Sequence, residues 1–149
     1  MKEVSKRSVK IPRLDCVPKH CSLLIVMGVI MNVGLEKSRK FAIRIYNLYR
    51  YLCDTKHEYT LAKQLLRSGT SIGANLSEAQ YSVSKKEFLV KASISLKECA
   101  ETEFWLDLLK EINLINQNEY NSIIQDCKEI LRLLISITKA AKMSIQIAK

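Results

Sequence analysis

The absence of proline from most of this chain constrains its fold more than any other feature. Both prolines, Pro12 and Pro18, lie near the N-terminus, and residues 19–149 contain none. Proline interrupts the hydrogen-bond ladder of a helix, so a long proline-free chain with apolar residues at intervals of three and four favours long helices. The chain has 149 residues, 48% of them hydrophobic, which is enough to fill the core of one domain.

Apolar periodicity and capping residues divide this region into four predicted helices. The first is expected from Leu35 to Cys53. Pairs with capping-box spacing predict where the other three begin, namely Thr55 with Glu58, Ser84 with Glu87, and Asn116 with Glu119. Four long helices with short connections predict an all-α fold, an up-down-up-down antiparallel four-helix bundle over residues 32–149.

Residues 1–31 differ from the rest of the chain because they combine basic side chains, both prolines and the apolar run at residues 23–31. This order imitates a signal peptide, but no small-residue cleavage site follows it. The run is also shorter than the roughly 20 residues that span a bilayer as a helix. We expect a poorly ordered N-terminal extension, or an upstream stretch added by the choice of start site, since Met27 or Met31 could begin the domain. Secretion is the alternative. Five cysteines without a C-x-x-C pair favour a reduced, cytoplasmic protein.

The stretch from Thr60 to Gln80 contains two glycines, Gly69 and Gly73, among other small residues. Four residues apart on a helix, they lie on one face. Each glycine lowers helix stability by roughly 1 kcal/mol relative to alanine. A continuous helix therefore needs a compensating interaction, such as close packing of a neighbouring helix or subunit. The alternative is that the glycines end one helix and a turn starts another. Trp105 is assigned to core or interface packing.

The formal net charge of +9 is compatible with nucleic acid as a partner, although solubility is the commoner meaning of such a charge. Helical spacing places Lys37, Lys40 and Arg44 on one stripe of the first predicted helix, and Lys63 and Arg67 one turn apart on the second. These five are the candidate nucleic-acid-binding residues. The second half of the third predicted helix is acidic instead, which is typical of a solvated or subunit-facing surface.

The sequence offers little for catalysis or metal binding. His20 and His57 are far apart, and no histidine follows to complete the Glu-x-x-His pairs of a di-metal bundle. No nucleophile with a base and no glycine-rich phosphate loop is evident. We therefore expect no enzymatic activity, no catalytic residues, no cofactor and no metal.

Three segments carry a resemblance to a known family. They are LLRSGTSIGANLSEA (Leu65–Ala79), SKKEF (Ser84–Phe88) and ECAETEFWLDLL (Glu98–Leu109). With them, the chain resembles bacterial four-helix-bundle proteins encoded in intervening sequences of large-subunit ribosomal RNA genes. That family is similar in turn to the accessory variability proteins of diversity-generating retroelements. The resemblance covers about residues 32–142, and Arg67 is the basic residue within its most specific motif.

The resemblance implies that the chain forms a ring-like homo-oligomer, with a homopentamer as the expected form. It also implies that the retroelement relatives bind nucleic acid and a reverse transcriptase. Two functions are therefore predicted. The first is a non-enzymatic, oligomeric protein that binds the backbone of RNA or DNA, without a membrane partner. The alternative is a protein-interaction scaffold, for example a partner of a reverse transcriptase, with no nucleic-acid role of its own.

Overall fold

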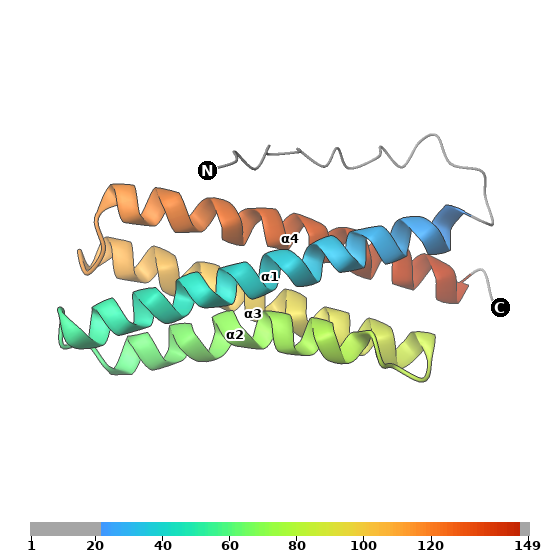
Figure 1. Ribbon diagram of the computed structural model, residues 1–149, viewed down its shortest axis with the longest axis horizontal. Helices are drawn as coiled ribbons and strands as arrows, with labels where there is room; N and C mark the ends of the chain where they lie inside the picture. Colours follow the sequence, from blue (N-terminus) through green and yellow to red (C-terminus); the bar gives the residue numbers. More distant parts are fainter. Residues whose placement is uncertain (1–21, 147–149) are drawn as a thin grey trace, which may run out of the picture.

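The structure, a computed structural model, describes residues 22–146, with side chains from residue 28 onward. Regular secondary structure in this range is entirely helical. The elements are α1 (Ser22–Asp54), α2 (Thr60–Ala79), α3 (Lys85–Glu111) and α4 (Gln117–Gln146), and they lie lengthwise beside one another (Figure 1). Among these described helices, none is long and apolar enough to cross a membrane.

Each helix packs against two others. α1 contacts α2 and α4, and α3 contacts the same two helices, whereas α1 and α3 do not contact each other in the described part of the chain. The core between them is filled mainly by aliphatic side chains. The largest fully buried residues are Phe41, Ile45, Leu52, Leu65, Ile72, Leu76, Leu106, Leu109, Ile130 and Leu134. The predicted four-helix, all-α fold is thus confirmed.

Helix α1 begins at Ser22 rather than at the predicted Leu35. The apolar run at residues 23–31 therefore continues into the same helix, and the expected domain boundary at residues 31 and 32 falls inside it. Met31 is buried, and Gly34 lies against Leu76 and Ile137. Nothing in this segment breaks a helix, and its buried positions extend the periodicity of the residues that follow. The rest of the expected extension, residues 1–21, lies outside the described residues.

Two of the three predicted capping boxes are confirmed. The Ser84 hydroxyl accepts the Glu87 N–H at 3.1 Å, and the Asn116 side chain accepts the Glu119 N–H at 3.0 Å. The third prediction is wrong, because α2 begins at Thr60 instead of following Thr55. The chain turns through His57, which has a positive φ of 55°. The carboxylate of Glu58 then accepts the first N–H groups of α2, a role that a side chain just before a helix can fill.

Helix α2 is continuous through both glycines, as preferred from the sequence. A Cβ atom built on Gly69 would lie 2.9 Å from two carbons of the buried Ile45 side chain. A Cβ on Gly73 would lie 3.2 Å from the hydroxyl of Ser38. α1 therefore approaches α2 closely along this face, and the van der Waals packing between the two helices offsets the low helix propensity of glycine.

Trp105 is half-buried against the core, with its indole N–H donating to a carboxylate oxygen of Glu101 at 3.1 Å. The neighbouring Phe104 is 57% exposed and contacts the Trp105 ring edge-on. α3 thus presents aromatic side chains both inward and outward.

Candidate nucleic-acid interface

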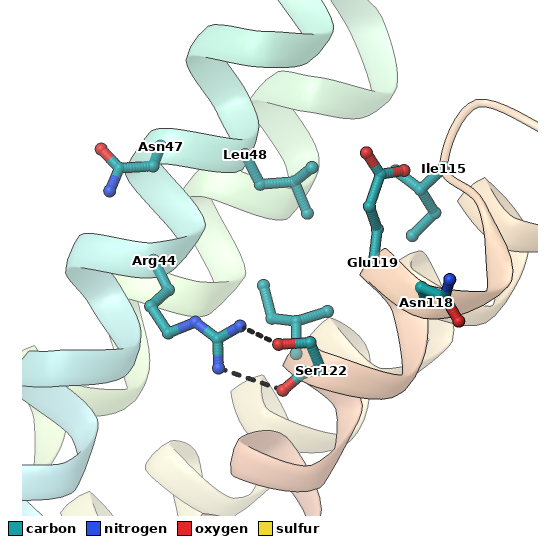
Figure 2. A pocket seen from close by; sticks show the side chains of 8 residues that line it. Arg44, Asn47, Leu48, Ile115, Asn118, Glu119 and Ser122 are labelled. Carbon is teal, nitrogen blue, oxygen red and sulfur yellow. Dashed lines mark hydrogen bonds between the residues drawn. The ribbon is translucent and has the colours of Figure 1, made fainter.

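The predicted basic stripe of α1 lies beside α4. Lys37 forms an ion pair with Glu129 at 2.9 Å. The guanidinium of Arg44 donates to the Ser122 carbonyl at 3.0 Å and to the Ser122 hydroxyl at 2.8 Å, and it also pairs with Asp126. Figure 2 shows the Arg44 side chain reaching across from α1 to Ser122 on α4. Both cations therefore hold α1 against α4.

Lys40 is paired as well, with Glu36 one turn earlier on the same helix at 2.5 Å. The hydrogen bond from Lys40 lowers the pKa of the Glu36 carboxyl below its usual value. All three predicted cations of α1 thus have an acidic partner. An ion pair of this kind has a much weaker field at a distance than a free charge, so this surface attracts phosphate less than the sequence suggests.

A cleft of about 440 Å³ lies next to Arg44, between α1 and the start of α4. Its walls carry the amides of Asn47 and Asn118 together with apolar side chains (Figure 2). The Glu119 carboxylate in this wall already accepts the Asn116 N–H that caps α4. The charged groups of the cleft are consequently engaged in holding the fold.

Lys63 and Arg67 differ from the three cations of α1. Both are exposed on α2, and neither forms an ion pair among the described residues. The structure therefore does not join the five predicted residues into one charged stripe. Lys37 and Arg44 lie at the boundary of α1 with α4, whereas α2 packs against the other side of α1.

A shallow groove of about 550 Å³ runs between α1 and α2. Its lining includes Gly73 and several small or polar side chains of α2, namely Thr70, Ala74 and Ser77, together with Gln80 just after the helix. Arg39 lies at its α1 edge and is exposed, without an ion pair among the described residues. Sequence reasoning missed Arg39 because helical spacing sets it apart from Lys37 and Arg44. The small residues that follow Gly69 at helical spacing were the available signal for the groove.

The acidic half of α3 is partly neutralised inside the fold. Glu103 lies 3.9 Å from Lys128, and Asp107 accepts the Tyr120 hydroxyl at 2.6 Å. The hydrogen bond to Asp107, with some burial, raises the pKa of Tyr120 to about 12. No cluster of three or more metal-ligating side chains occurs within the part of the chain that the structure describes.

Three cysteines of the described region, Cys53, Cys99 and Cys127, are buried free thiols. The sulfurs of Cys99 and Cys127 lie 3.8 Å apart where α3 meets α4. Their mutual hydrogen bonding and their burial raise the pKa of Cys127. A thiol in this state is a poor nucleophile, so the pair serves as packing between the two helices.

Comparison with known proteins agrees with this architecture. A family model described as 23S rRNA-intervening sequence protein matches residues 32–136. The chain is also similar to a crystal structure of a protein of unknown function from the S23 ribosomal protein family of Bacteroides thetaiotaomicron. The two share 49% identity and superpose with a TM-score of 0.73, over 74% of this chain and 98% of that one. No curated protein matches. The chain therefore belongs to the family of 23S rRNA-intervening sequence proteins.

Proposed function

We propose that this protein is a non-enzymatic homo-oligomer that binds the phosphate backbone of RNA or DNA in the cytoplasm. Lys63 and Arg67 on α2 make the central contacts, and Arg39 at the edge of the adjoining groove adds to them. The observation that carries the proposal is that these three cations are exposed and free of ion pairs among the described residues, whereas Lys37, Lys40 and Arg44 are paired. This shifts the contact surface from the α1 stripe to α2.

The α2 side of the groove beside these cations suits an extended polyanion, and the Glu36 carboxylate on the α1 side is paired with Lys40. Its α2 wall consists of small side chains and hydroxyl groups, so a backbone can approach the helix closely. Phosphate oxygens accept hydrogen bonds from arginine, lysine and hydroxyl donors without reference to base sequence. Binding through this surface is therefore weakly sequence-specific and falls steeply with salt.

The bundle topology and the ring also belong to this proposal. Ile45 of α1 meets Gly69 of α2, whereas the earlier Ser38 meets the later Gly73. Likewise, the Thr102 hydroxyl of α3 donates a hydrogen bond to Ser68 of α2. The Ser95 hydroxyl, earlier on α3, donates to the carbonyl of Ile72, which lies later on α2. These contacts support neighbours that run in opposite directions, as in an up-down-up-down bundle. A ring of such bundles, with five copies as the family resemblance implies, repeats the α2 cations around one surface and strengthens their field.

The test measures binding of a structured RNA by the full chain at about 50 and 200 mM salt. The wild-type affinity should fall at least about tenfold between the two conditions, as expected for several phosphate contacts. The double substitution Lys63→Glu with Arg67→Glu should weaken binding by about tenfold or more at the lower salt.

The matched control is Lys139→Glu with Lys142→Glu on α4. It makes the same change in net charge at two exposed lysines that form no ion pair among the described residues. If the control weakens binding as much as the α2 substitutions, the contact is not on α2. If neither the wild type nor the variants bind RNA or DNA, the proposed function is wrong.

A protein-interaction scaffold, for example for a reverse transcriptase, is the second candidate. The observation that favours it is the exposure of apolar side chains on the outer face of α3, including Val90 and Phe104. In that case the purified protein carries no nucleic acid, and the ratio of its absorbance at 260 and 280 nm is that of protein alone.

A further inference from the structure

One face of the bundle carries unpaired positive charge together with an exposed aromatic ring. It is formed by the outer sides of α1 and α2, which lie against each other (Figure 1). Its cations Arg39, Lys63 and Arg67 form no ion pair among the described residues. Ile43 and Tyr46 follow Arg39 on α1 at intervals of four and three residues and are 57% and 48% exposed. We call these five residues the α1/α2 face.

Contacts between the two helices place Tyr46 of α1 near Arg67 of α2 along the bundle. Ile45, which directly precedes Tyr46, lies against Gly69, and Arg67 is two residues before that glycine. Axes of packed helices are separated by about 8–10 Å, a distance that tyrosine and arginine side chains can span together. The ring and the guanidinium are therefore close enough to contact one ligand.

Tyr46 and Arg67 also lie on the same side of this helix pair. The groove between α1 and α2 is lined by Ala42 on one wall and Thr70 on the other. Tyr46 follows Ala42 by one helical turn, and Arg67 precedes Thr70 by about one turn, so each continues a wall of the groove. The groove thus leads to an aromatic ring on its α1 side and a cation on its α2 side.

The carboxylates of α1 and α2 are neutralised. Each of them forms an ion pair with a lysine or arginine, and they are Glu36, Asp54 and Glu78. The charge left unpaired on the described part of these helices is that of the three cations of the α1/α2 face. This surface therefore complements an anionic ligand.

The Tyr46 ring is supported by its neighbours. Its centroid lies 6.4 Å from that of Tyr49, and the two rings are tilted by 32°. Tyr49 is half-buried against the core, so it anchors the exposed ring. Arg50, one turn after Tyr46, is paired with Asp54 at 2.8 Å and is therefore not among the free cations. A ring that is already supported loses little freedom when a flat ligand covers it.

We propose that the α1/α2 face binds single-stranded RNA or DNA, with a base stacked on the ring of Tyr46 and phosphates held by Arg39, Lys63 and Arg67. The inference rests on the proposed function and names the form of nucleic acid that the same surface takes. Stacking of bases on aromatic rings and contact of cations with phosphates are the two interactions that bind single strands with little sequence preference.

The apolar part of the face favours a single strand over a duplex. In a duplex the bases are stacked on one another, so the face would meet only phosphates and sugars. Tyr46 and Ile43 would then lie against a charged backbone. An unpaired base can leave its stack and cover both side chains, while the phosphates on either side of it reach the cations.

The test compares a labelled single strand of about 15 nucleotides with the duplex that it forms with its complement. Fluorescence anisotropy measures binding by the full chain at about 50 mM salt. Wild type should bind the single strand more tightly than the duplex. Tyr46→Ala should raise the dissociation constant for the single strand about tenfold, because the stacked base loses its support. Its dissociation constant for the duplex should change less than about twofold, which also shows that the variant is folded.

Two further variants serve as controls. Tyr46→Phe keeps an aromatic ring and should bind the single strand within about twofold of wild type. Phe104→Ala removes an aromatic side chain of α3 that is 57% exposed and lies outside the α1/α2 face, so it should also keep the wild-type affinity. Equal weakening by Tyr46→Ala and Phe104→Ala would show that binding does not depend on the ring of Tyr46.

Salt dependence separates stacking from phosphate contact. Tyr46→Ala removes no charge, so the plot of log binding constant against log salt concentration should keep the wild-type slope for the single strand. Arg67→Ala removes one phosphate contact and should make that slope shallower by about 0.7. If Tyr46→Ala changed the slope as much as Arg67→Ala does, stacking on Tyr46 would be contradicted.

Fluorescence reports on the stacked ring directly. Tyr46→Trp adds an indole to that of Trp105, the only tryptophan of the wild type. A base stacked on an indole quenches its emission, so a saturating amount of the single strand should quench Tyr46→Trp by a larger fraction than wild type. Equal fractional quenching in the two proteins would overturn the assignment of the stacking site.

The inference and the proposed function give different patterns when they fail. If wild type binds single strand and duplex equally well, and Tyr46→Ala weakens neither, the contact is with the backbone alone. Stacking is then wrong and the proposed function stands. If wild type binds neither form, both are overturned.

Discussion

At the scale of single residues, the clearest constraint is the contact of Gly69 with Ile45. Replacing Gly69 by alanine adds a methyl group 2.9 Å from two carbons of a fully buried, branched side chain. Overpacking of this kind costs about 1–3 kcal/mol, which exceeds or cancels the roughly 1 kcal/mol improvement in helix propensity. We expect Gly69→Ala to reduce the free energy of unfolding in urea by about 1 kcal/mol.

Gly28 provides the matched control, because a Cβ atom there has no neighbour within 4 Å. Gly28→Ala should therefore raise the free energy of unfolding by up to about 1 kcal/mol. If the two substitutions changed stability with the same sign and size, the close approach of α1 and α2 would not explain Gly69.

Tyr120 is expected to show a pH dependence of its own. The hydrogen bond to Asp107 raises its pKa to about 12, so the folded state favours the protonated phenol. A raised pKa contributes stability that is fully present below the unfolded value of about 10 and is lost as the pH rises toward 12. The change in absorbance near 295 nm, wild type minus Tyr120→Phe, should have its midpoint near 12. A midpoint near 10 would contradict the bond.

At the scale of the helix, the start of α3 depends on Ser84. Its hydroxyl accepts the Glu87 N–H, while the Glu87 carboxylate accepts the Val83 N–H at 2.9 Å. Ser84→Ala should lower the free energy of unfolding by about 1 kcal/mol, the usual value of a helix cap. Ser84→Asp keeps an acceptor at the cap and should restore most of the loss, as measured by thermal or urea denaturation. Equal losses in both variants would argue against capping.

At the scale of the whole molecule, association should couple stability to concentration. A contact made only by folded chains raises the melting temperature with protein concentration, by about 2–5 °C for each tenfold increase. A wild-type melting temperature that is independent of concentration would mean that folded copies do not associate.

The sequence by itself determined the helical class, the places of the helix connections to within a few residues, and the caps at Ser84 and Asn116. These features are local: each depends on hydrogen bonds and apolar spacing within a few residues, which the sequence displays directly. The N-terminal cap of α2 was not predicted correctly. The positive φ of His57 and the capping by Glu58 depend on the conformation of a turn, which residue spacing does not reveal.

Only the tertiary structure decided which charges are free. Lys37 and Arg44 have the same spacing as a solvated basic stripe, yet each finds a partner on α4, which lies far away along the chain. The acidic run of α3 likewise concealed the exposed side chain of Phe104, because charged and apolar residues share the outer side of that helix. Helical periodicity tells which residues share a face. What that face meets depends on how the helices are arranged in space.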